Sequence, residues 1–115
     1  MAVDVSHIVD VIEVMENFMS RKRPPEEMRD ELDLGYKIED QSVIIHEIRT
    51  SFPNPKMKFE PLIAKATYVK KSGSWKVFWM RADLKWHSYK PKPVVDSLSE
   101  FVELVDEDAY HLFFG

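Results

Sequence analysis

The period at which apolar residues recur changes twice along this chain of 115 residues, and this change restricts the fold more than any other feature. Near the N-terminus the apolar residues are spaced as on one side of a helix. Between residues 32 and 82 they alternate as in strands, and after residue 97 the helical spacing returns. The order helix, four strands, helix predicts one α+β domain over residues 1–115, with a largely antiparallel sheet and both helices on one face.

Residues 6–22 are predicted to form the N-terminal amphipathic helix. Seven apolar residues between Ile8 and Met19 fall within an arc of about 160°, and polar residues occupy the opposite side. The basic residues 21–23 suit the negative end of the helix dipole, and Pro24-Pro25 then ends the helix. The apolar arc is wide enough to contact more than one partner surface.

Four strands are predicted at residues 32–39, 42–49, 62–70 and 75–82. The prolines in residues 50–61 indicate a loop, and residues 83–93 show no clear period. The third and fourth strands carry apolar side chains at both parities. We therefore expect the sheet to be covered on both faces, or to bind a partner with one of them.

The C-terminal helix is predicted to begin near Ser97. Ser97 and Glu100 match a capping box, in which each side chain accepts a hydrogen bond from the backbone amide of the other residue. The acidic residues 106–108 end this helix against its own dipole, so we expect a Lys or Arg from elsewhere to pair with them. The apolar tail 112–114 should pack on the domain or on a neighbour.

Charge is distributed unevenly along the chain. The net charge is −4, but residues 65–92 hold eight basic residues and one acidic residue, whereas residues 93–115 hold six acidic residues and no basic one. A basic segment of this kind is typical of a surface that binds nucleic acid or another anion. The alternative is that the acidic ends of the chain cover the basic middle in the folded domain.

Several classes of protein are excluded or disfavoured by composition. The absence of cysteine excludes disulfides, thiolate metal sites and cysteine nucleophiles. Three glycines provide no phosphate-binding loop, and the four histidines lack the spacing of metal ligands, so we expect no cofactor and no metal. The first residues lack the pattern of a signal peptide, and no apolar run reaches the ~20 residues of a membrane helix. We therefore expect a cytoplasmic protein without a membrane partner.

The densest mixture of functional groups is the segment 79–89. Arg81 and Lys85 can bind an anion, an indole can stack on a planar group, and His87 can act as a general base near neutral pH. A purely structural interpretation, in which Arg81 pairs with Asp83 and the indoles are core, stays open. The predicted binding residues are Lys65, Trp79, Arg81, Asp83, Lys85, Trp86, His87 and Tyr89.

From about residue 20 onward the chain resembles a small bacterial family catalogued only as a domain of unknown function, number three thousand and twenty-four. The resemblance is carried by residues 23–25 (RPP), 33–36 (DLGY), 63–69 (IAKATYV), 75–89 (WKVFWMRADLKWHSY), 105–108 (VDED) and 113–115 (FFG). The stretch around Trp79-Met80-Arg81 is its most specific part. The resemblance implies a stand-alone bacterial protein, and it implies no activity, substrate or catalytic residue.

Three functions follow from these observations. We favour a non-enzymatic binding module with an anion or nucleic-acid surface on residues 65–92. The first alternative is a small enzyme that uses Arg81, Asp83 and His87. The second is a structural homo-oligomer. A homodimer is expected because two apolar sheet faces, only two helices and a Phe-Phe terminus leave surplus apolar surface.

Overall fold

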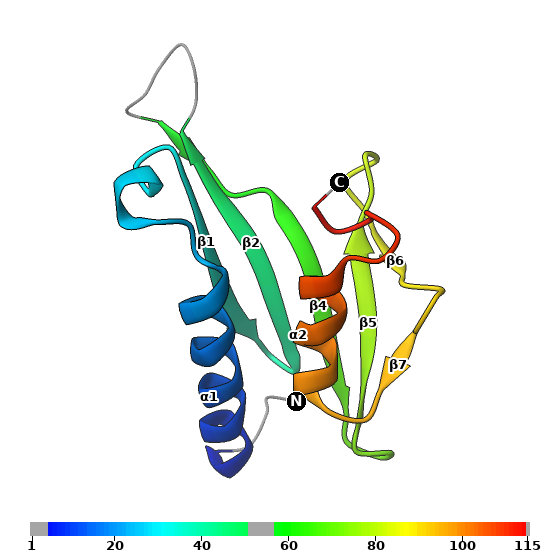
Figure 1. The fold of residues 1–115 in the computed structure, drawn as a ribbon. Helices are drawn as coiled ribbons and strands as arrows, with labels where there is room; N and C mark the ends of the chain where they lie inside the picture. Colours follow the sequence, from blue (N-terminus) through cyan, green and yellow to red (C-terminus); the bar gives the residue numbers. More distant parts are fainter. Residues whose placement is uncertain (1–4, 51–56, 115) are drawn as a thin grey trace.

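A computed structural model describes residues 5–50 and 57–114 of the chain (Figure 1). Its elements are α1 (Val5–Lys22), the 3-10 helix η1 (Glu26–Met28), β1 (Leu32–Glu39), β2 (Ser42–Thr50), β3 (Lys58–Phe59), β4 (Leu62–Val69), β5 (Ser74–Met80), β6 (Trp86–Ser88), β7 (Val94–Val95) and α2 (Leu98–Glu107). The predicted α+β class is confirmed, with an N-terminal helix, a largely antiparallel sheet and a C-terminal helix.

The strands form one antiparallel sheet in the order β1-β2-β4-β5-β6. The four predicted strands correspond to β1, β2, β4 and β5. The sheet also contains β3, which pairs with the end of β2, and β7, which pairs with β5 beside β6. These additional strands have two or three residues each, which is too short for an alternating pattern to be recognised in the sequence.

Two segments therefore differ from the prediction. The loop predicted at residues 50–61 contains β3, and β2 extends to Thr50. Residues 53–55, whose prolines indicated that loop, lie outside the described residues. The unclassified segment 83–93 contains β6, because the turn after β5 brings the chain back antiparallel to it. Tertiary pairing, rather than local pattern, defines both short strands.

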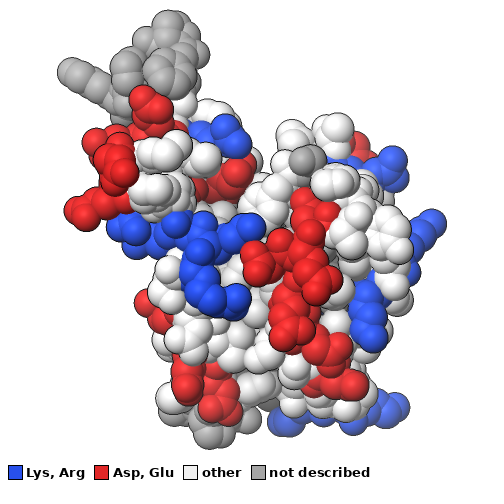
Figure 2. Space-filling view, viewed as in Figure 1, with Lys and Arg blue, Asp and Glu red and all other residues white. Residues whose placement is uncertain are grey.

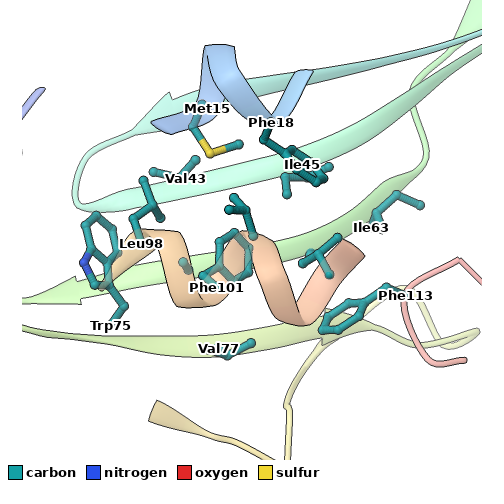
Figure 3. Close-up of a cluster of buried hydrophobic side chains, with 14 of the residues drawn as sticks. Met15, Phe18, Val43, Ile45, Ile63, Trp75, Val77, Leu98, Phe101 and Phe113 are labelled. Atoms are coloured by element: carbon teal, nitrogen blue, oxygen red, sulfur yellow. The ribbon is translucent and has the colours of Figure 1, made fainter. Parts of the chain in front are cut away.

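Both helices lie on the same face of the sheet, with α1 beside β1 and β2 and α2 in front of β4 and β5 (Figure 1). The side of α1 that carries Met15 and Phe18 is fully buried, and α1 contacts both β1 and α2, as the width of its apolar arc predicts. Side chains from the two helices, the sheet and the C-terminal tail meet in one core (Figure 3). Ile12, at the edge of the arc, is 41% exposed.

Strand alternation assigns every sheet residue to the helix side or to the opposite face, which we call the open face. Val43, Ile45 and Val77 are buried on the helix side. A bulge between β2 and β4 interrupts the alternation, so that the consecutive residues Ile63 and Ala64 both belong to the core. In the described part of the chain, no helix packs on the open face (Figure 1).

The N-terminus of α2 confirms one half of the predicted capping box. The Ser97 hydroxyl accepts from the Glu100 amide at 3.2 Å. The Glu100 carboxylate accepts instead from the amide of Asp96, at 3.4 Å, so the predicted bond to the Ser97 amide is wrong. Ser97 itself has the extended backbone angles that are usual for an N-cap residue.

The acidic end of α2 is paired as predicted, and the partners come from α1. Asp106 forms ion pairs with Lys22 at 3.1 Å and with Arg21 at 3.8 Å. The basic end of α1 therefore lies beside the acidic end of α2, and the two groups of charge are adjacent in Figure 2. Arg21 and Lys22 lie in the last turn of α1, and they also lie close to the last turn of α2. The same two cations therefore complement the dipoles of both helices.

Asp108 connects α2 to the C-terminal tail. It is 8% exposed and has the left-handed angles φ 42° and ψ 51°, which Asp tolerates better than most residues. Its two carboxylate oxygens accept the backbone amides of Phe113 and Phe114, each at 3.0 Å. Phe113 is buried in the core, and Lys22 lies over the ring of Phe114. The predicted packing of the tail is confirmed, and the tail packs on its own domain.

Candidate functional site

The predicted site residues lie on β5, on β6 and on the turn between them, and alternation divides them between the two sheet faces. Trp79 is the direct cross-strand partner of His87, and Met80 is the partner of Trp86. Because paired residues share a face and successive residues alternate, Trp79 and His87 lie on the helix side, whereas Trp86 lies on the open face. A segment that is continuous in sequence therefore forms two separate surfaces.

On the helix side, at the edge of the sheet, there is a cavity of about 340 Å³ that we call the basic pocket. Its lining residues are Trp79, Arg81, His87, Ser88, Lys90, Pro91 and Leu112. The guanidinium carbon of Arg81 lies 5.6 Å from the centroid of the Trp79 ring, and the His87 ring lies 6.3 Å from it. None of the described residues that line the pocket is acidic.

Asp83 pairs with His87 rather than with Arg81. Its Oδ2 lies 2.9 Å from His87 Nε2, and its Oδ1 accepts the Lys85 amide at 3.0 Å. The hydrogen bond with His87, followed by that of the Lys85 amide, lowers the pKa of the Asp83 carboxyl below its ordinary value. A carboxylate only accepts, so Nε2 of His87 carries the proton in this contact. The direct contacts of Asp83 are therefore with His87 and Lys85, and Arg81 acts on it only through its charge, which also lowers the pKa of Asp83.

On the open face, Lys65 joins two aromatic rings. Its Nζ lies 4.9 Å from the ring centroid of Phe78 and 4.9 Å from that of Trp86. Burial lowers the pKa of the Lys65 ammonium. We call Lys65, Phe78, Met80 and Trp86 the open-face cluster. Its members are only partly buried, in contrast to the side chains under the helices.

The other two predicted residues belong neither to the basic pocket nor to the open-face cluster. Tyr89 is 2% exposed and packs in the core, with its ring 4.7 Å from that of Phe113. Tyr89 is therefore a core residue, whose ring is out of reach of a ligand on the surface. Lys85 is exposed in the turn that follows β5. The prediction placed Tyr89 with the binding residues because it continues the aromatic segment, but alternation turns its side chain inward.

The acidic residues of the C-terminal helix do not pair with the basic middle segment. Acidic side chains gather over α2 in Figure 2, and their described ion pairs go to α1. Within residues 5–50 and 57–114, Lys65, Lys76, Arg81 and Lys90 form no ion pair with an acidic residue. These four cations are therefore unpaired by the described acidic residues, although the Arg81 charge helps to lower the pKa of the nearby Asp83 and Glu39 acts on Lys65.

The described residues contain no group of three or more His, Asp or Glu side chains that could hold a metal ion. His46 is buried with its ring against Gly35, where a Cβ atom would come within 2.9 Å of the ring, so His46 is a packing residue. No described helix has both the length and the apolar character needed to cross a bilayer.

Six residues of these surfaces were not among the predicted ones, namely Phe78, Met80, Ser88, Lys90, Pro91 and Leu112. Lys90 belonged to the basic segment, and Phe78 belonged to the strand with two apolar faces, so both signals were present in the sequence. Pairing Phe78 with Lys65 required the strand register, which a single sequence does not provide. Leu112 reaches the pocket only because Asp108 folds the tail back, and no local pattern indicates this.

The family profile described as Domain of unknown function (DUF3024) matches residues 4–115, so the chain belongs to that family. The resemblance found in the sequence is confirmed, and it extends over nearly the whole chain. A search of the curated proteins and a search of the solved structures gave no significant match. The family assignment carries no activity, so the function is argued from the two surfaces.

Proposed function

We propose that the protein is a non-enzymatic binding module that takes a phosphate-bearing anion in the basic pocket. The observation that carries this proposal is the meeting of Arg81 and Lys90 around one cavity, with the Trp79 indole beside them. Neither cation has a described ion-pair partner within the chain. A divalent or polyvalent anion would bind both cations at once through charge-assisted hydrogen bonds, which would offset the cost of its leaving bulk solvent.

The chemistry of the lining suits phosphate better than a carboxylate of a neighbouring protein. The Arg81 guanidinium presents paired donors that match two phosphate oxygens, and Lys90 adds a compact charge. The Trp79 indole and Leu112 provide an apolar wall for a planar or aliphatic group attached to the phosphate. At about 340 Å³ the cavity lies at the small end of ligand sites, which suits one such group rather than a large cofactor.

Titration with tripolyphosphate, followed by isothermal calorimetry and by intrinsic Trp fluorescence, tests the proposal. We expect binding at low salt that weakens with a log–log slope of about −2, since two cations are neutralised. The double variant Arg81→Ala with Lys90→Ala should lose about a hundredfold or more in affinity, because it removes two charge-assisted bonds that contribute about 1.5–3 kcal/mol each.

The matched control is Lys71→Ala with Lys76→Ala. It removes the same charge from exposed positions at the other end of β5, away from the pocket. Equal losses in the two double variants would show diffuse attraction rather than a site. No binding of tripolyphosphate at low salt would contradict the proposal outright.

A second function is favoured by one observation, the 2.9 Å contact between Asp83 and His87. A carboxylate that orients an imidazole beside an anion-binding Arg is an arrangement used in general acid–base catalysis. We propose this small-enzyme alternative with His87 as the base and Arg81 as the anion-binding residue. Hydrolysis of p-nitrophenyl phosphate or p-nitrophenyl acetate that disappears in His87→Gln, with tripolyphosphate affinity retained, would favour the enzyme over the binding module.

A further inference from the structure

We infer that the open-face cluster is a stacking platform for the bases of single-stranded nucleic acid. This inference rests on the proposed function, because the basic pocket supplies phosphate binding while the open face supplies contacts to the bases. The two surfaces share β5 and β6 and lie on opposite sides of them. They can therefore be tested separately.

The strand register brings the two rings together. Phe78 pairs directly with Lys65 on β4 and with Ser88 on β6, and Trp86 is its diagonal neighbour on β6. Neighbouring strands are about 4.8 Å apart, so both rings lie within reach of adjacent bases. The Lys65 ammonium, 4.9 Å from both centroids, holds the two rings in place.

The contrast with the helix side argues against a purely structural role for these rings. Val77, one residue before Phe78, is fully buried on the helix side, whereas Phe78 faces away from the helices and is only partly buried. The sheet already has one complete core on its helix side. Aromatic side chains on the uncovered face of a sheet are a common means of stacking the bases of single strands.

The positive charge of the open face indicates which kind of partner it binds. Lys65 and Lys76 lie on it, and Lys85 and Arg81 follow in the turn at its edge. The acidic residue that acts on Lys65, Glu39, lies at the far edge strand and is itself paired with Lys37. A second copy that docked through the same face would bring the same cations against these, whereas a polyanion complements them. The face therefore fits nucleic acid better than self-association.

A base must expose its flat face to stack on a side chain, so the partner is a single strand rather than a duplex. A strand that crosses β4, β5 and β6 places its bases over Phe78 and Trp86. Its phosphates then pass Lys76 and the β5–β6 turn, and the turn leads to Arg81 and the basic pocket. Such binding depends weakly on base sequence, because every base has a stacking face.

The experiment compares a 12-nucleotide oligo(dT) with an abasic oligomer of the same length, by fluorescence anisotropy at low salt. We expect the wild-type protein to bind oligo(dT) at least tenfold more tightly than the abasic oligomer. Trp86→Leu should remove most of this difference and keep the affinity for the abasic oligomer. Arg81→Ala with Lys90→Ala should weaken both ligands by a similar factor.

Two measurements guard against a variant that fails to fold. Phe78→Leu repeats the test on the neighbouring strand, with far-UV circular dichroism as the check on folding. Photocrosslinking of the wild-type protein to an oligomer that carries 5-iododeoxyuridine needs no variant, and we expect crosslinks at Trp86 or Phe78. Crosslinks only at Trp79 or Trp75, on the helix side, would overturn the inference.

The remaining outcomes separate this inference from the proposed function. Equal affinity for oligo(dT) and the abasic oligomer overturns the platform and leaves the anion pocket intact. Failure of both oligomers and of tripolyphosphate to bind overturns both proposals. Concentration-dependent sedimentation that Trp86→Leu abolishes would assign the open face to a second copy of the chain, and this too overturns the platform.

Discussion

The helix side and the open face are built from the same strands, but apolar side chains of similar type are buried to different extents on the two faces. On β5, Val77 faces the helices and is fully buried, whereas Phe78 and Met80 face away and stay partly exposed. On β2, Ile44 points to the open face but is 5% exposed, between its cross-strand partners Lys37 and Lys65. On the open face the aliphatic stems of lysine side chains cover apolar surface. On the helix side the two helices cover it.

The open face is therefore covered by charged side chains of its own strands, whereas the other face is covered by helices. Lysine stems shield Ile44, and the Lys65 ammonium lies over the rings of Phe78 and Trp86, which stay partly exposed. A face of this kind is stable alone and still attractive to a planar anionic partner. The difference can be tested by making the same substitution on each face, or at a buried and an exposed position, and comparing the stability of the two variants.

The largest expected effect comes from a charge placed under α1. Met15 is fully buried between α1 and the sheet, so Met15→Asp should destabilise the fold by several kcal/mol. A small domain has only about 5–15 kcal/mol in total, so we expect loss of cooperative unfolding or aggregation. Thermal melts and light scattering provide the measurement.

Ile12→Asp is the matched control, because Ile12 lies on the same helix and is 41% exposed. Its effect should stay within about 1 kcal/mol. A Met15→Asp variant that melts at the wild-type temperature would show that the arc is not core. A collapse of Ile12→Asp would instead indicate that the exposed edge of α1 is covered in solution.

A smaller effect separates two phenylalanines on opposite sides of the sheet. Phe101 of α2 is fully buried, so Phe101→Ala should cost about 3–5 kcal/mol through lost contacts and a cavity. Phe78→Ala removes the same atoms from the open face and should cost about 1 kcal/mol. Urea unfolding of both variants measures the difference. Equal costs would mean that the open face is packed as tightly as the core.

The sequence predicted the elements whose pattern is long and periodic. The arc of α1, the four main strands and the capped start of α2 are confirmed because each has enough residues for a period to emerge. The short strands β3, β6 and β7 were missed, since two or three residues carry no period and are defined by their partners. The Asp106 ion pairs were expected, but only the fold identifies Arg21 and Lys22 as the partners.

The candidate site was predicted as one cluster, and the structure divides it. Composition indicated the right segment, but the assignment of Trp79 and Trp86 to opposite faces depends on where β5 ends and β6 begins. The homodimer stays a prediction. One of its three motives, the Phe-Phe terminus, is accounted for within the chain, because Asp108 binds the tail amides and Phe113 enters the core.

The smallest expected effect is a dependence of stability on alkaline pH, with opposite sign on the two faces. On the helix side, burial and then the neighbouring Glu16 raise the pKa of Tyr36 to about 12. The unfolded chain loses this proton near pH 10, so Tyr36 favours the folded state below about pH 10 and this contribution is lost as the pH rises toward 12. On the open face, burial lowers the pKa of Lys65, so the protonated ammonium destabilises the folded state at neutral pH. This destabilisation disappears as the pH rises toward the ordinary lysine pKa of about 10.4.

Tyr36→Phe removes the group that destabilises the fold at high pH, and it keeps the ring. Urea unfolding between pH 8 and pH 11 should therefore show a flatter decline in the free energy of unfolding for Tyr36→Phe than for the wild type. Lys65→Met removes the opposing contribution and should make the decline steeper. Tyr110→Phe, at an exposed position near the C-terminus, is the matched control for the loss of a hydroxyl. If Tyr36→Phe and Lys65→Met change the pH dependence of the free energy of unfolding in the same direction, the opposite contributions assigned to the two faces are wrong.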